Sequence, residues 1–249
     1  MANWSDPRPG LAPVSAATGA RGVTYDAGLR SYMLSVYNYM ASAVLLTGIV
    51  AMGVFYSGAY TALISATGRG LSGLGYIVAF APLGIVLAMS FGQQRMATGT
   101  LQVLFWAYAG LLGASLSTIF VAYSGASIAG AFFATAAGFA GLSLYGYTTE
   151  RNLSAFGSFL IVGLVGLIVA MLVNAFLHSG PMALVISVVG VLIFAGLTAY
   201  DTQRTKSIYS YVAGTEGEGR AKIMSALNLY LDFINMFLFI LRLFGSSRN

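Results

Sequence analysis

Two aspartates are the residues of this sequence most suited to chemistry, because each lies in or beside a long apolar stretch. Asp232 lies within the run 227–244, which reads LNLYLDFINMFLFILRLF, and Asp201 directly follows the apolar run 182–200. The remaining acids all lie in polar segments and are Asp6, Asp26, Glu150, Glu216 and Glu218. A carboxylate at membrane depth is costly and indicates a functional site. The pair therefore predicts the location of the functional site.

Asp232 is part of a polar stripe on its predicted helix. Asn228, Asp232 and Asn235 are spaced i, i+4 and i+7, which places them on one helix face. A polar stripe on an apolar helix should face protein or water rather than lipid. The stripe therefore predicts that this last helix is central and is surrounded by the others.

Two carboxylates that meet in a low-dielectric site cannot both ionise cheaply, so they share a proton. With one proton they form a hydrogen bond between two helices; without it they repel or bind a cation, and carboxylate oxygens are preferred ligands of Ca²⁺. Asp201 and Asp232 are thus the predicted proton sensor, cation gate and Ca²⁺ ligands, with Asn228 and Asn235 as a supporting polar face. The alternative is that each acid separately bonds a polar neighbour and only holds helices together.

The composition indicates an all-α integral membrane protein. Of 249 residues, 58% are hydrophobic and only 8% are charged. Only helices and closed barrels satisfy the backbone in lipid, and the continuous apolar runs exclude a barrel. The chain has no cysteine and a single histidine, His178, so thiolate chemistry is excluded and a histidine-rich metal centre is not expected.

The apolar runs predict seven spans, each long enough to cross a bilayer. They cover residues 32–56, 74–92, 98–122, 126–146, 155–177, 182–203 and 223–244. Residues 1–30, rich in Gly, Ala, Pro and Ser, are expected to form a flexible cytoplasmic tail. Residues 31–249 are expected to form one transmembrane domain.

Cationic loop residues predict the orientation, because they are retained on the cytoplasmic side. With the N-terminus inside, the inner set is Arg8, Arg21, Arg30, Arg95, Arg151, Arg204, Lys206, Arg220 and Lys222, and the outer set is Arg69, Arg242 and Arg248. This distribution predicts a multi-pass protein of the cell membrane with a cytoplasmic N-terminus and an extracytoplasmic C-terminus. The expected partners are the lipid bilayer, Ca²⁺ and protons; the net charge of +5 is not a signal for nucleic acid.

Two segments carry a family resemblance. The stretch 196–203 reads GLTAYDTQ and the stretch 228–235 reads NLYLDFIN; a third segment, 145–154, reads YGYTTERNLS. Together they resemble the Bax inhibitor family, the transmembrane Bax-inhibitor-motif proteins, in a bacterial-type form. The resemblance implies seven helices with the last at the centre of six. It also implies a pH-sensitive Ca²⁺ leak gated by an aspartate pair, carried here by Asp201 and Asp232.

The same resemblance implies a basic residue near the end of the second helix that latches onto the pair, and Arg95 is the candidate here. The other interpretation of Arg95 is a cytoplasmic anchoring charge at a helix end. Family members are also linked to suppression of cell death and, in some bacteria, to regulation of a membrane protease. The alternative function is therefore that of a regulatory membrane protein that binds a protease or another membrane protein, with any leak secondary.

An intramembrane aspartyl protease also uses two aspartates on adjacent helices, and Tyr200-Asp201 fits its first motif. Its second motif requires Gly-x-Gly-Asp, whereas Asp232 follows Leu229-Tyr-Leu. We therefore expect no enzyme activity and no cofactor other than Ca²⁺ as the permeant ion.

Overall fold

The computed structural model describes residues 15–65 and 70–246, with side chains from residue 27 onward. Within these residues the chain is helical and contains no strand. The elements are α1 Ser15–Tyr56, η1 Ala59–Leu63, α2 Gly73–Gly92, α3 Thr98–Leu116, α4 Ile119–Ala122, α5 Gly125–Thr148, α6 Ser154–Leu177, α7 Gly180–Val212 and α8 Glu218–Phe244. Seven described segments are long and apolar enough to cross a membrane, with α3 and α4 together forming one of them. The predicted all-α, seven-span fold is thereby confirmed.

Serine side chains begin three of the spans. The Oγ atoms of Ser72, Ser124 and Ser179 accept hydrogen bonds from backbone N–H groups three residues later, at 3.0, 3.2 and 3.4 Å. Each bond satisfies one of the N–H groups that a helix start leaves without an intrahelical partner. Helices α2, α5 and α7 therefore start at positions that the sequence specifies locally.

Three helix boundaries differ from the predicted spans. Helix α1 begins at Ser15, inside the segment 1–30 expected to be a tail, while residues 1–14 lie outside the described part. The predicted connection 204–222 shrinks to 213–217, because α7 continues to Val212 and α8 begins at Glu218. The extension of α7 is polar by composition but packs through buried side chains. Tyr209 in α7, for example, places its ring 5.2 Å from that of Tyr32 in α1.

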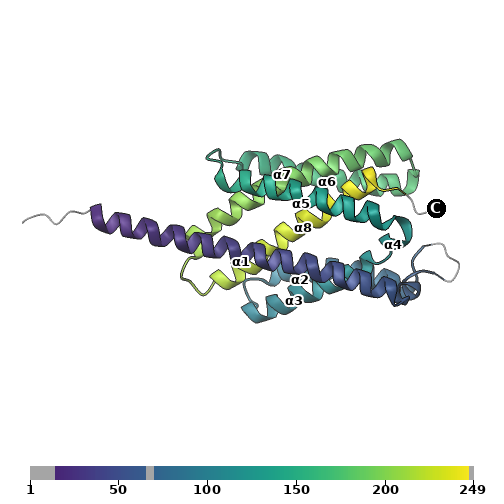
Figure 1. Cartoon of the computed structure of the whole chain (residues 1–249), viewed down its shortest axis with the longest axis horizontal. Coiled ribbons are helices and arrows are strands. Elements are labelled where there is room, and N and C mark those ends of the chain that lie inside the picture. The colour runs from purple at the N-terminus through teal and green to yellow at the C-terminus, as the bar shows by residue number, and fades with distance from the viewer. Residues whose placement is uncertain (1–14, 66–69, 247–249) are drawn as a thin grey trace, which may run out of the picture.

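Helix α8 lies at the centre of the bundle, as its polar stripe predicts. It runs diagonally between a layer of α1, α2 and α3 and a layer of α5, α6 and α7 (Figure 1). It packs directly against α1, α3, α5 and α7, while α2 packs on α3 and α6 packs on α7. In its most apolar stretch 67% of residues are buried, against 44% for α7 and less for every other described span.

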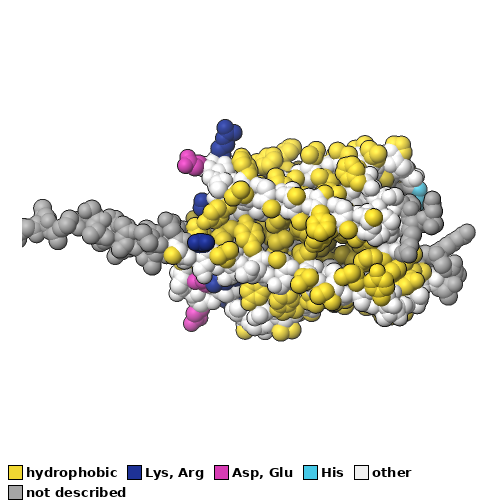
Figure 2. All heavy atoms as spheres, viewed as in Figure 1, with side chains coloured by type: hydrophobic (Ala, Val, Ile, Leu, Met, Phe, Trp, Pro, Cys, Tyr) yellow, Lys and Arg dark blue, Asp and Glu magenta, His cyan; other side chains and the backbone are white. Residues whose placement is uncertain are grey.

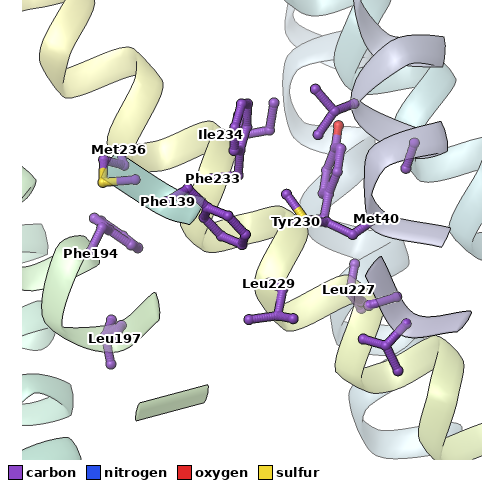
Figure 3. Packing of buried hydrophobic residues seen from close by; sticks show 14 of the residues in the cluster. Met40, Phe139, Phe194, Leu197, Leu227, Leu229, Tyr230, Phe233, Ile234 and Met236 are labelled. Carbon is purple, nitrogen blue, oxygen red and sulfur yellow. The ribbon is translucent and has the colours of Figure 1, made fainter. Parts of the chain in front are cut away.

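The core forms where α8 meets its neighbours. Figure 3 shows Leu227, Leu229, Tyr230, Phe233, Ile234 and Met236 of α8 together with Met40, Phe139, Phe194 and Leu197 of the surrounding helices. Glycines let the helices approach each other closely at two contacts. Between α5 and α7, a methyl group on Gly146 would overlap the backbone of Ala199; between α7 and α8, a methyl group on Gly190 would lie 2.7 Å from the Phe239 ring. Small residues at helix contacts are the usual means of packing in lipid.

The surface matches a protein surrounded by lipid. Apolar side chains cover the flank of the bundle, and charged side chains gather at the end where α1 enters it (Figure 2). We call this the charged end; it contains the α2–α3, α5–α6 and α7–α8 connections. Exposed large apolar residues such as Phe80, Val162 and Leu172 would be costly in water but suit a bilayer.

Candidate functional site

The antiparallel pair α7 and α8 brings the two aspartates to a similar level of the bundle. Asp201 lies eleven residues before the end of α7, and Asp232 lies fourteen residues after the start of α8. At 1.5 Å per residue, these positions are roughly 17 and 21 Å from the turn that joins the helices. Sequence positions 31 residues apart therefore meet across one helix contact.

The carboxyl groups of Asp201 and Asp232 lie within hydrogen-bonding range of each other. Since an ionised carboxylate only accepts hydrogen bonds, such a bond requires a proton on one of the two groups. Asp232 is only 4% exposed, and its Oδ2 atom has no hydrogen-bond partner among the described residues. Asp201 is less deeply buried. The arrangement can hold one proton between the two acids.

The pair lies in the wall of a cavity of about 540 Å³, which we call the carboxylate cavity. Asn228 and Asn235 line the same cavity, so the predicted polar face is directed into it. The Nδ2 group of Asn235 donates to the Leu231 carbonyl at 2.8 Å. The apolar part of the lining comes from four helices and includes Leu83, Ile161, Leu164, Ile168, Met171, Phe194, Leu197, Leu231, Leu238 and Phe239.

Arginines of α7 and α8, rather than Arg95, lie at this cavity. Arg95 is exposed in the α2–α3 connection and is not part of the lining, so the structure does not bring it together with the aspartates. Arg204, three residues after Asp201, lines the cavity and interacts electrostatically with Asp201. Arg242, which lies over the Phe239 ring at 5.6 Å, lines it further along α8.

Sequence reasoning did not assign Arg204 to the site. It was counted only as a cytoplasmic charge at the end of a predicted span. The available signal was its i+3 spacing from Asp201, which places the two side chains on neighbouring positions of one helix face. That signal becomes informative only because α7 continues past the predicted boundary at residue 203.

The opposite face of α8 is fixed by buried hydroxyl groups. The Thr47 hydroxyl donates to the Ala109 carbonyl at 2.9 Å, and the Tyr230 hydroxyl lies 2.6 Å from the same Thr47 oxygen. Because the Thr47 proton is already used, Tyr230 is the donor in the second bond. This chain of hydrogen bonds joins α8 to α1 and α3 and determines which face α8 presents to α7.

The fold and the site define a seven-span helical membrane protein with a carboxylate pair beside its central helix. The family model described as "Inhibitor of apoptosis-promoting Bax1" matches residues 29–249. The chain therefore belongs to the Bax inhibitor family, which confirms the resemblance carried by the two aspartate segments.

Bacterial relatives match over almost their whole length. A protein of Rickettsia prowazekii is 48% identical over 233 residues, covering 93% of this chain and 96% of the relative. The inner membrane protein YbhL of Escherichia coli is 42% identical over 224 residues, covering 89% of this chain and 94% of YbhL. A membrane protein of Streptococcus pyogenes is 37% identical over 222 residues. The similarity thus extends across the entire transmembrane domain.

Proposed function

We propose that this protein is a pH-sensitive cation leak channel of the cell inner membrane, with Ca²⁺ as a permeant ion. Its gate is the proton-sharing pair Asp201 and Asp232. The observation that carries the proposal is the buried carboxyl of Asp232, which has Asp201 as its neighbour, lies beside a cavity, and has an Oδ2 atom without a hydrogen-bond donor among the described residues. A carboxylate in such a position requires a proton or a cation to offset its charge.

The proton state of the pair determines how α7 and α8 interact. With one proton, a charge-assisted hydrogen bond joins the two helices and stabilises their contact. Without it, two negative charges face each other where screening by water is weak, and they repel strongly. Loss of the proton therefore either separates the helices or recruits a cation to the pair.

The oxygen ligands around the pair suit a Ca²⁺ ion that passes through the site rather than one that is held tightly. Ca²⁺ takes six to eight oxygen ligands. The pair supplies up to four carboxylate oxygens, and the amide oxygens of Asn228 and Asn235 line the same cavity. Among the described residues no group of three His, Cys, Asp or Glu side chains converges on one point. A Ca²⁺ ion at the pair would therefore keep part of its water shell, which favours exchange over tight retention.

The charged end of the bundle is the proposed cytoplasmic end. The α2–α3 and α5–α6 connections carry Arg95 and Arg151, and Arg220 lies in the first turn of α8; cationic residues near span ends are retained in the cytoplasm. With seven spans the C-terminus then lies outside. In this orientation Asp201 lies nearer to the cytoplasmic end of α7 than to its other end, and Asp232 lies near the middle of α8.

The deciding experiment is Ca²⁺ flux into liposomes that contain the purified full-length protein and an enclosed indicator dye, over a series of pH values. We expect flux above that of protein-free liposomes, with a dependence on pH. Glu216→Gln, which removes an exposed acid of the α7–α8 connection, should leave that dependence unchanged. Absence of flux at every pH would contradict the channel. It would favour the alternative, a regulatory protein that binds a membrane protease or another membrane protein.

A further inference from the structure

A second cavity lies at the charged end, and its lining is polar. It has a volume of about 580 Å³ and is bounded by the α5–α6 connection and by α7. We call it the vestibule; its lining consists of Thr149, Glu150, Asn152, Ser154, Tyr200, Gln203, Arg204, Lys206, Ser207 and Tyr211. Tyr200 and Arg204 also line the carboxylate cavity, so these two side chains lie between the two cavities.

Hydrogen bonds from α7 fix the walls of the vestibule. The Gln203 amide accepts from the Leu153 N–H at 2.9 Å and donates to the Arg151 carbonyl at 2.8 Å. One turn later, the Lys206 ammonium donates to the Tyr147 carbonyl at 3.0 Å. These bonds satisfy backbone groups around the α5–α6 connection and hold it against α7. The vestibule is therefore a built feature of the fold.

The junction of the two cavities, which we call the neck, combines one fixed and one less constrained side chain. The Tyr200 ring packs on the backbone of α6 at Gly157, where an added methyl group would overlap the ring. Arg204 is exposed, and its attraction to Asp201 does not reach salt-bridge distance, since Lys222–Glu218 is the one ion pair within the described residues. The guanidinium can thus change position without breaking a tight contact.

We propose that the vestibule is the cytoplasmic mouth of the ion path, and that cations pass between it and the carboxylate cavity through the neck. Arg204 is the residue that sets selectivity and rate there. Its charge opposes an incoming cation and competes with that cation for Asp201, which keeps the leak slow. An anion attracted by Arg204 would next be repelled by the negative charge of Asp201 and Asp232. The proposal rests on the proposed cation conduction, but the water-filled connection itself can be tested separately.

The experiment uses the natural absence of cysteine from the chain. Ser207→Cys places a single thiol in the vestibule, and Asn228→Cys places one in the carboxylate cavity. Each full-length variant is reconstituted in phosphatidylcholine–phosphatidylglycerol liposomes and treated from either side with impermeant cationic or anionic methanethiosulfonates. We expect both thiols to react from the same side, the one at position 228 more slowly.

Charge at the neck is tested in the Asn228→Cys background. Arg204→Gln should raise the rate of modification by the cationic reagent roughly tenfold, because one opposing unit charge is removed, and should not raise the rate for the anionic reagent. The matched control is Arg151→Gln, which removes an exposed arginine that does not line either cavity. A structural disturbance would instead change the modification rates of the cationic and anionic reagents alike. Gly157→Ala, which displaces the Tyr200 ring, should alter the rate at position 228 and leave position 207 unaffected.

The outcomes separate this inference from the proposed function. Charge-selective modification of position 228 through the neck supports the inference, even if liposomes show no Ca²⁺ flux and the channel proposal fails. Modification of position 228 only from the side opposite to position 207 would overturn the inference. Equal effects of Arg204→Gln and Arg151→Gln on the rate of modification at position 228 would overturn it as well.

Discussion

The hydroxyl groups of Tyr230 and Thr47 lie 2.6 Å apart and fix the central helix on the side opposite to the carboxylate pair. Residues two positions apart on a helix point about 200° apart, so Tyr230 faces α1 and α3 while Asp232 faces α7. A rotation of α8 that separated the two aspartates would have to break this buried bond. The hydroxyl pair thus positions the proposed gate without touching it.

Removing each hydroxyl should have unequal effects on stability. Thr47→Val leaves the Tyr230 hydroxyl buried without a partner and should lower the free energy of unfolding by about 1–3 kcal/mol. Tyr230→Phe leaves Thr47 bonded to the Ala109 carbonyl and should cost only about 0.5–1.5 kcal/mol. Thermal melts in detergent measure both. Thr148→Val, the same change at an exposed position, is the control, and equal losses at positions 47 and 148 would contradict the assignment.

The sequence predicted the central helix because Asn228, Asp232 and Asn235 repeat with a helical period. It did not predict where α7 ends, because the extension past residue 203 is polar in composition, yet Thr205 and Tyr209 are buried in it. The role of Arg204 depends on that extension and on the two cavities. No local sequence pattern indicates the position of either cavity. Arg95 was proposed because the family resemblance implies a basic residue near the end of the second helix; it is exposed in the α2–α3 connection and lies outside the lining of the carboxylate cavity.

Two glycines of α5 should respond differently to the same substitution. Gly146→Ala forces a methyl group against the backbone of Ala199 and must shift α5 away from α7, at a cost of about 1–3 kcal/mol. Gly141→Ala meets no atom within 4 Å and should change stability little. Comparing the two melting temperatures checks the helix contact. If both variants melt like the wild type, α5 and α7 do not approach as closely as described.

The proposed orientation predicts opposite locations for the two ends of the chain. Seven spans place the C-terminus outside when cationic connections hold the charged end in the cytoplasm. Alkaline phosphatase, which is active only outside the cytoplasm, should therefore be active when fused after residue 249 and inactive when fused in the connection 213–217. The reverse pattern would show that the charged end faces outward.

Proton and Ca²⁺ occupancy of the pair should be linked. A cation favours the fully ionised pair, so binding of Ca²⁺ should release protons. By reciprocity, lower pH should weaken Ca²⁺ binding. Calorimetry of the purified protein in buffers with different ionisation enthalpies measures the released protons directly. This prediction concerns affinity and not flux, which also reflects gating. Binding heat that does not depend on the buffer would contradict a shared site.

The decisive substitutions are those of the two aspartates themselves. Asp201→Asn and Asp232→Asn each remove a titrating group while retaining size and much of the hydrogen-bonding capacity. If the pair shares one proton, either change should abolish most of the pH dependence of flux, and the double variant should add little, because groups that act as a unit are not additive. If each acid is only structural, both single changes should lower the melting temperature, leave the pH profile unchanged and add in the double variant. A liposome series combined with thermal melts distinguishes the two cases, and additive stability losses with an unaltered pH profile would refute the gate while leaving the fold intact.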